Sequence, residues 1–352
     1  MEEEQVVVSF CISTYKREAI VEALVLNILS SSNPYFEVVV VDDCSGDGTI
    51  KRLSDITDTR LRVFEREQRG GGSACWYDAL EKGKGRWLFQ VLDRDWIDIS
   101  KMDLLIQTLR ELENSNVSFA VAGEKLSEDE KVYICKEGEE TLQEFALRFS
   151  HPTGQIFRKS EWDMLENKEQ YFMDEKYGIY PHGYLYTILG NKNKGAYILF
   201  DICDKKHYNQ RVIKTVSGVY STRTDKKEWF WPESRFRLLT LAAENVELIE
   251  KKEYIKEFML SRYVNFFYAV TLEWYNNCQN EILKIRYGRN DIETNYMSLM
   301  VNGFDYITLF REYLEHNRFW WADDNFYSIL CNVDQQLVKW LIEWTNELRK
   351  QS

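Results

Sequence analysis

The first 115 residues alternate between two patterns of hydrophobic positions. Four short runs of β-branched and other apolar residues have the length of buried strands, at residues 6–12, 37–41, 61–64 and 87–92. Between them, apolar residues recur at helical spacing from Ile20 to Ile28, and a helix is expected after the glycine turn, over residues 73–82. Another helix is expected to begin with Ser100 as its N-cap. Strands that alternate with crossover helices predict a doubly wound, mostly parallel α/β sheet flanked by helices.

The second half of the chain has a looser pattern. Strands are expected at residues 117–122, 132–135, 155–157 and 197–200, and a helix at 142–149. From about residue 233 the chain is rich in helix formers and aromatic residues, with an apolar stripe near the end at Leu337, Leu341, Trp344 and Leu348. We therefore expect an α/β domain over residues 1–232 and a helical C-terminal domain over residues 233–352.

Composition and charge narrow the classes of protein. Forty-five Lys and Arg against 57 Asp and Glu leave a net charge of −12 in 352 residues, which argues against nucleic acid as a partner. The seven cysteines are scattered without a CxxC pair, so neither a disulfide framework nor a zinc knuckle is expected. The longest apolar stretch, residues 263–272, is too short to span a bilayer. We expect a cytoplasmic protein without a transmembrane span, and peripheral contact with the inner face of the plasma membrane stays open.

Polar clusters follow three of the predicted strands: Ser13-Thr14-Tyr15, Asp42-Asp43 and Asp93-Arg94-Asp95. In doubly wound sheets, ligands bind beyond the carboxyl ends of the strands. Two carboxylates one residue apart, as in Asp93 and Asp95, can hold a divalent cation together with phosphate oxygens and water, although a solvated acidic loop has the same pattern. The Asp42-Asp43 pair suits either hydrogen bonds to a ribose or base, or the bracing of its own loop.

A basic, glycine-rich segment adds a possible site for phosphate. Arg66 and Arg69 lie beside the Gly70-Gly71-Gly72 run, and cationic side chains next to exposed backbone N–H groups suit a diphosphate. The spacing of these glycines matches neither a Walker A loop nor the GxGxxG motif. The sequence therefore argues against a nucleoside triphosphatase and against a nicotinamide-dependent enzyme. A sugar nucleotidyltransferase would need a glycine-rich loop directly after the first strand. This chain has no glycine there, at residues 13–17, so the sequence disfavours that class of enzyme as well.

Four segments, in this order and spacing over residues 5–98, resemble the signature segments of inverting family-2 glycosyltransferases: VVVSFCISTYKRE, FEVVVVDDCSGDGT, the glycine turn before a helix, and GRWLFQVLDRD. The resemblance implies the GT-A fold, a nucleotide-diphospho-sugar donor, with a UDP-sugar as the default, and Mn²⁺ or Mg²⁺. It implies that Thr14, Tyr15 and Asp43 contact the nucleoside. It also implies that Asp93 and Asp95 occupy the metal and diphosphate position, with Asp95 the direct metal ligand.

Two sets of residues are candidates for the base that takes the proton of the acceptor hydroxyl. Family members carry a Glu-Asp pair some way after a Gly-x-x-Phe-Arg strand, which matches residues 154–158 here, but the expected position holds Pro181-His182. Either His182 serves as the base, or Asp174 or Glu175 does; otherwise His182 is a loop histidine and the two acids are charges at a helix start. Trp76-Tyr77 stands where the family has Arg-Asn, and Trp96 where a third acid is common.

The resemblance also implies a basic or histidine-bearing lid over the metal and diphosphate, where this chain has His207 beside Lys205, Lys206 and Arg211. The expected function is transfer of a hexosyl or N-acetylhexosaminyl group to a carbohydrate or lipid-linked glycan acceptor in surface polysaccharide synthesis. The alternative is a catalytically degenerate transferase that serves as a nucleotide- or glycan-binding scaffold.

Overall fold

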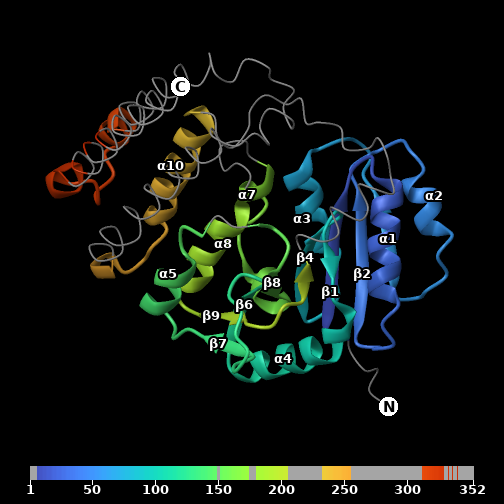
Figure 1. Cartoon of the computed structure of the whole chain (residues 1–352). Helices are drawn as coiled ribbons and strands as arrows, with labels where there is room; N and C mark the ends of the chain where they lie inside the picture. Colours follow the sequence, from blue (N-terminus) through green and yellow to red (C-terminus); the bar gives the residue numbers. More distant parts are fainter. Residues whose placement is uncertain are drawn as a thin grey trace, which may run out of the picture. The chain divides into compact units, whose positions relative to one another are not determined.

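The computed structural model describes residues 6–148, 151–173, 180–204, 232–254 and 311–328, together with 332, 335 and 339 (Figure 1). The contacts between Cα atoms divide the chain into two compact units, Met1–Tyr220 and Ser221–Ser352. The expected domain boundary after residue 232 stays a prediction.

The first unit is built on an eight-stranded sheet with the order β3-β2-β1-β4-β8-β6-β9-β7. Strands β1 to β4 are mutually parallel, β8 runs antiparallel to both its neighbours, β9 is parallel to β6, and β7 lies antiparallel at the edge. The predicted mostly parallel sheet is confirmed. Its strands are β1 (Val8–Thr14), β2 (Phe36–Asp42), β3 (Leu61–Glu65), β4 (Trp87–Leu92), β6 (Val117–Ala122), β7 (Val132–Ile134), β8 (Gln155–Arg158) and β9 (Lys194–Ile198).

Helices cover this sheet, and a separate two-stranded ladder joins β5 (Trp96–Ile97) to β10 (Cys203–Asp204). The helices of the first unit are α1 (Glu18–Leu29), α2 (Thr49–Ser54), α3 (Gly72–Lys82), the 3₁₀ turn η1 (Ile99–Lys101), α4 (Met102–Asn114), α5 (Glu139–Phe145), α6 (Lys159–Met164), α7 (Gln170–Met173) and α8 (Pro181–Gly190). The second unit contains α10 (Pro232–Glu247) and η2 (Lys252–Tyr254), and residues 311–317 and 324–328 are helical.

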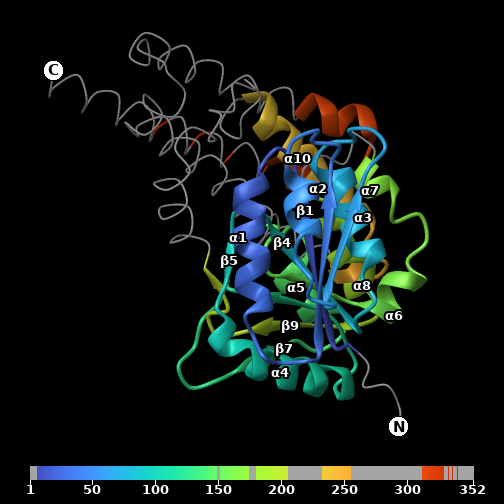
Figure 2. The ribbon, with the colours of Figure 1, turned by 90° about the vertical axis from the view of Figure 1, so that its right-hand side faces the viewer.

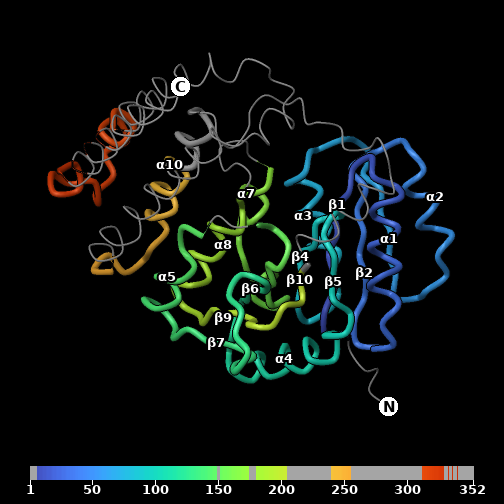
Figure 3. The backbone as a smooth tube through the Cα atoms, viewed as in Figure 1, coloured from blue at the N-terminus to red at the C-terminus, as the bar shows by residue number. Residues whose placement is uncertain are grey.

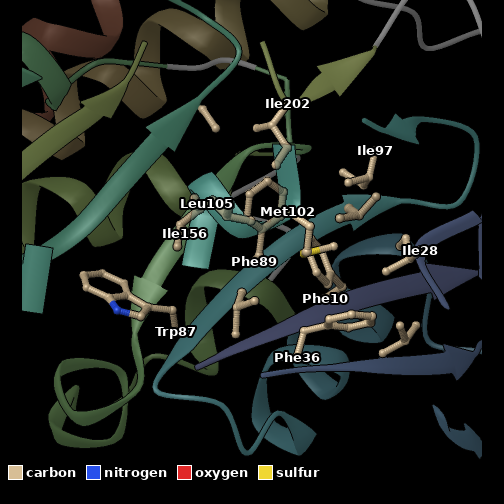
Figure 4. Close-up of a cluster of buried hydrophobic side chains, with 14 of the residues drawn as sticks. Phe10, Ile28, Phe36, Trp87, Phe89, Ile97, Met102, Leu105, Ile156 and Ile202 are labelled. Atoms are coloured by element: carbon tan, nitrogen blue, oxygen red, sulfur yellow. The ribbon is translucent and has the colours of Figure 1, made fainter. Parts of the chain in front are cut away.

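The central strands β1, β2, β4 and β6 are buried on both faces, which accounts for their nearly continuous apolar runs, whereas the edge strands β3 and β7 are partly exposed. Phe10 and Phe89 point into one core with Ile28 of α1 and Leu105 of α4 (Figure 4). Residues on the other face pack under α3, where the Cys75 thiol contacts the carbonyl oxygen of Val41 at 3.2 Å. Figure 2 shows α1 and α3 on opposite sides of the strands. With both faces covered, the carboxyl ends of the strands are the part of the sheet left for a ligand.

Three local predictions are corrected by the structure. Asp98 caps the helix in place of Ser100: its Oδ1 accepts from the Ser100 backbone nitrogen at 3.0 Å, because the helix begins earlier with the 3₁₀ turn η1. Helix α5 starts three residues earlier than expected and ends at Phe145, because Ala146 adopts an extended conformation. His182 lies on a helix rather than a loop, since Pro181 occupies the first turn of α8, a position that tolerates proline.

The second unit buries the apolar face of α10, including Leu239, Ala242 and Val246. The Tyr313 hydroxyl donates to the Glu244 carboxylate at 2.8 Å and so ties residues 311–317 to this helix. The predicted stripe from Leu337 to Leu348 lies outside the described residues. Among the helices that the structure describes, none combines the length and apolar character needed to cross a bilayer.

Candidate functional site

The carboxyl ends of β1, β2 and β4 bring three of the predicted polar clusters together (Figure 3 shows the path of the chain). The Thr14 hydroxyl, at the end of β1, donates to Asp93 Oδ2 at 2.9 Å although the two residues are 79 positions apart. The Asp43 backbone nitrogen donates to the Thr14 carbonyl oxygen at 2.9 Å. Thr14, Asp43 and Asp93 are all buried. Three residues predicted to contact a donor therefore form one continuous cluster.

Asp93 is held by a cation as well as by Thr14. The Arg17 guanidinium, from the turn between β1 and α1, lies 2.6 Å from Asp93 Oδ1. Because Asp93 is only 2% exposed, this ion pair supplies charge compensation that water does not. The sequence alone gives no signal for Arg17 beyond a basic residue shortly after the first strand.

Asp95 is held by the loop that precedes β8. The Thr153 hydroxyl donates to Asp95 Oδ2 and itself accepts from the Leu92 backbone nitrogen at 2.9 Å. The imidazole Nδ1 of His151 lies 3.5 Å from the same carboxylate oxygen and accepts from the Thr153 backbone nitrogen at 3.3 Å. The sequence analysis missed both His151 and Thr153, because the contacts cross from β4 to a segment some 60 residues later.

The glycine turn before α3 is bound to Asp43. The Gly70 and Gly71 backbone nitrogens donate to the two Asp43 carboxylate oxygens at 2.8 and 2.9 Å. The Arg66 Nε atom lies 3.7 Å from Asp43 and 3.4 Å from Asp78. These two amides are therefore directed at a buried carboxylate and not at a diphosphate, which corrects the expectation for this turn. The physical reason is that a carboxylate removed from water requires donors of its own.

Asp42 has a bracing role in the loop after β2. Its two oxygens accept from the backbone nitrogen of Ser45, at 2.7 Å, and from the Ser45 hydroxyl. The Ser45 hydroxyl oxygen in turn accepts from the Lys16 backbone nitrogen at 2.8 Å. Burial raises the pKa of the Asp42 carboxyl above its ordinary value. Of the two interpretations offered for Asp42-Asp43, loop bracing therefore applies to Asp42.

Tyr15 and Arg69 form a second contact between the first strand and the glycine turn. The Arg69 guanidinium carbon lies 4.3 Å from the centroid of the Tyr15 ring, and Lys16 Nζ lies 5.4 Å from it. Arg69 is exposed, whereas Tyr15 is half-buried. Cation–π contact orients the guanidinium while it stays accessible to an anionic ligand.

The candidate base His182 lies at the start of α8 and is fully buried. Its ring packs among three aromatic rings, with centroid distances of 5.6 Å to Trp76, 5.5 Å to Tyr180 and 5.8 Å to Tyr186. Trp76, which replaces the arginine common in the family, therefore fills the space between α3 and His182. Asp174, Glu175 and His207 lie outside the described residues.

The residues at the end of β4 fit a divalent cation that is shared with a phosphate group. Within the described ranges, no group of three or more His, Cys, Asp or Glu side chains could hold a metal ion by itself. Hard cations such as Mg²⁺ are commonly held by one or two carboxylates, with substrate phosphates and water completing the shell. Asp93 and Asp95 supply carboxylate oxygens of this kind. Since Arg17 already pairs with Asp93, Asp95 is the candidate direct ligand.

Comparison with known proteins shows which proteins this chain is similar to. Residues 9–161 match the model of the family described as glycosyl transferase family 2. TuaG of Bacillus subtilis, whose name assigns it to teichuronic acid biosynthesis, is 32% identical over 121 residues, which cover 34% of this chain and 47% of TuaG. WfgD of Escherichia coli, a UDP-Glc:α-D-GlcNAc-diphosphoundecaprenol β-1,3-glucosyltransferase, is 29% identical over 114 residues, 32% of this chain and 43% of WfgD. The matches thus span less than half the length of these relatives.

A solved structure extends the likeness of the fold beyond the matched segment. TarS residues 1–349 from S. aureus, in complex with UDP-GlcNAc, superpose with a TM-score of 0.54 at 18% identity, covering 86% of this chain and 81% of that one. At this identity the likeness concerns the fold, which is GT-A. The strand order and the polar cluster at the carboxyl ends of β1, β2 and β4 agree with this fold, and residues 9–161, less than half of the chain, are similar to glycosyl transferase family 2.

Proposed function

We propose that this chain is an inverting glycosyltransferase that moves a hexosyl or N-acetylhexosaminyl group from a nucleotide-diphospho-sugar to an acceptor hydroxyl, assisted by Mn²⁺ or Mg²⁺. The observation that carries the proposal is a pair of buried carboxylates held in place at the end of β4. Asp93 accepts from the Thr14 hydroxyl and pairs with Arg17. Asp95 accepts from the Thr153 hydroxyl. Buried carboxylates held at the ligand-binding edge of a doubly wound sheet suit a cation that a diphosphate shares.

The names of similar proteins support a choice of donor and acceptor. UDP is the first choice of nucleotide, because TarS was solved with UDP-GlcNAc and WfgD is named for UDP-Glc. The acceptor is a carbohydrate or lipid-linked glycan in surface polysaccharide synthesis, as the names of WfgD and TuaG suggest for those proteins. A lipid-linked acceptor and a nucleotide donor would meet at the cytoplasmic, inner face of the plasma membrane, where we place the reaction.

Within this proposal each residue has a separate task. Thr14, Tyr15 and Asp43 bind the nucleoside, and Arg69 faces the charge of the diphosphate. Asp95, with Asp93 beside it, holds the cation, which when bound stabilises the negative charge of the leaving diphosphate. His207 follows Asp204 by three residues, and Asp204 pairs with Trp96 directly after Asp95. This register supports the proposal that His207 belongs to the metal and diphosphate site.

An inverting transfer also needs a base for the acceptor proton. We propose His182, Asp174 and Glu175 as the candidates. The contact between His182 and Trp76 supports His182, because it places the ring beside the helix that follows the glycine turn. Turnover of H182A, D174N and E175Q, each measured at saturating donor, separates the three: the base is the residue whose loss lowers kcat by about 10²-fold or more while donor affinity is kept.

The burial of His182 favours a second candidate function. Its ring has no exposed surface, and aromatic rings surround it, whereas a base must touch the acceptor hydroxyl. A degenerate transferase that binds nucleotide or glycan as a scaffold would tolerate this arrangement. It predicts metal-dependent nucleotide binding without release of UDP from any UDP-sugar.

The test of the proposed function is a thermal-shift screen of the full chain against UDP, GDP, CDP and TDP, with and without Mn²⁺. Ligand at a hundredfold excess over its dissociation constant stabilises the folded state by about 2.7 kcal/mol. A shift that needs both UDP and Mn²⁺ supports the donor site. The absence of a shift with every nucleotide would refute it. Release of UDP from a panel of UDP-sugars, measured with an undecaprenyl-linked acceptor, then separates the transferase from the scaffold.

A further inference from the structure

We propose that Thr153 is a positioning residue: its hydroxyl fixes the Asp95 carboxylate in the orientation that receives the cation. The inference rests on the proposed function and adds to it a residue from the loop before β8. That loop lies on the far side of β4 from the nucleoside cluster.

The contacts of Thr153 form a short relay between the backbone and the carboxylate. The hydroxyl oxygen accepts from the Leu92 backbone nitrogen at 2.9 Å and donates its proton to Asp95 Oδ2. Thr153 is fully buried and Asp95 is 1% exposed, so water does not compete for either bond. Since a hydroxyl has a single proton, acceptance from Leu92 directs that proton to Asp95. The Oδ2 atom is thereby fixed, and with it the orientation of the carboxylate that we assign to the cation.

The loop that carries Thr153 is itself held on three sides. Gly154 donates to the Gln90 carbonyl oxygen at 3.1 Å and accepts from the Ala122 backbone nitrogen at 2.8 Å, which ties it to the strands on either side of β8. Its φ of +99° favours glycine, and a Cβ atom there would run into the carbonyl oxygen of Ala122. The side-chain amide nitrogen Nε2 of Gln155 also donates to the His151 carbonyl oxygen at 2.9 Å. The Thr153 hydroxyl is therefore held in place by the sheet.

We expect the loss of this orienting hydrogen bond to weaken the binding of the cation. Partners of metal-ligating groups fix the ligand's orientation, and their loss lowers metal affinity about 10- to 100-fold. Val has the shape of Thr without the hydroxyl, so T153V leaves the packing of the loop and removes the relay. Ser keeps the hydroxyl, so T153S should keep the relay.

Thr141 offers a matched control outside the site. Like Thr153 it is fully buried, and its hydroxyl accepts from a backbone nitrogen, that of Gly195 at 3.2 Å, and donates to an oxygen, the Lys136 carbonyl at 2.7 Å. T141V therefore removes a hydroxyl with the same kind of partners but far along the chain from Asp95.

The experiment is calorimetric titration of UDP into the full-length wild type, T153V, T153S and T141V, in Mn²⁺ and in EDTA. We expect T153V to bind UDP about 10- to 100-fold more weakly in Mn²⁺ and unchanged in EDTA. T153S and T141V should stay within about threefold of wild type. T153A removes the same hydroxyl without the methyl groups of Val and carries the same expectation should T153V not fold.

Three results would overturn the inference. T153V could bind UDP in Mn²⁺ as tightly as wild type; it could lose affinity equally in EDTA; or T141V could lose as much as T153V. A wild type whose UDP binding does not depend on Mn²⁺ is a different failure. It refutes the metal-assisted function itself, and it is seen before any variant is compared.

Discussion

The ion pair between Arg17 and Asp93 gives the most direct stability prediction. R17M keeps a long apolar side chain but removes the guanidinium. The Asp93 carboxylate, which is 2% exposed, then loses its ion pair and keeps the hydrogen bond from the Thr14 hydroxyl. Breaking a buried pair by removing one partner costs about 3–5 kcal/mol. Because the Arg17 side chain is 29% exposed, water can solvate this position in R17M and offset part of that free-energy cost. We expect a loss of about 2 kcal/mol, within the range of about 1.5–3 kcal/mol for charge-assisted bonds.

Thermal unfolding measures this loss. For a unit of this size, 1 kcal/mol corresponds to about 2–4 °C in Tm, so R17M should unfold about 4–8 °C below wild type in the absence of ligands. R17K, which retains a cation, should recover most of the difference. R52M is the matched control: Arg52 pairs with Glu22 at 2.9 Å, but its side chain is 45% exposed, and we expect its Tm to stay at the wild-type value.

An R17M variant that unfolds within about 1 °C of wild type, a quarter of the smallest shift expected, would refute this role of Arg17. An equal loss of Tm in R52M would refute it as well, because the effect would then come from net charge and not from the buried carboxylate. In either case Arg17 would not be the group that stabilises Asp93.

Three further changes test other parts of the site. G154A should destabilise the protein by about 2–4 kcal/mol in urea unfolding, because its Cβ meets the Ala122 carbonyl at a left-handed φ; wild-type stability would contradict this. D43N turns one acceptor into a donor that faces a glycine amide, so it should cost about 1–3 kcal/mol and weaken UDP binding, and an unchanged urea midpoint would refute the role of Asp43 in the turn. Burial raises the pKa of Asp42, so the folded state binds protons more readily than the unfolded state, and stability falls as pH rises through that folded pKa. Wild type should therefore gain stability relative to D42N as the pH falls from 7 toward about 4, and a relative loss in urea titrations would contradict it.

Much of the fold follows from the sequence because each signal is local. The strands at β2 and β4 are runs of apolar residues, and α1 has its apolar positions at helical spacing. The start of α8 was missed although Pro181 is a typical first-turn residue, because the aromatic residues that follow give no clear polar face. Every described residue of α8 except Ile188 is buried, and such a helix has no amphipathic pattern to detect.

The sequence predicts those residues of the site that stand at the end of a strand or directly after it, and it misses those that come from distant loops. Thr14, Asp43, Asp93 and Asp95 directly follow or end β1, β2 and β4, so the topology brings them together. Arg17 and Thr153 reach the site through contacts across 76 and 58 positions, which no local pattern encodes. The glycine turn was assigned to phosphate because its amides looked exposed. The structure shows that Asp43 binds two of them, a pairing that depends on how β2 and α3 pack.

The central claim is that Asp95 holds the cation through which a nucleotide diphosphate is bound. Its most direct test is the dissociation constant of UDP for wild type and D95A, each in Mn²⁺ and in EDTA. We predict that wild type loses at least about tenfold in affinity when Mn²⁺ is removed, and that D95A binds as weakly in Mn²⁺ as wild type does in EDTA. Mn²⁺-dependent binding of UDP by D95A at wild-type affinity would contradict the account.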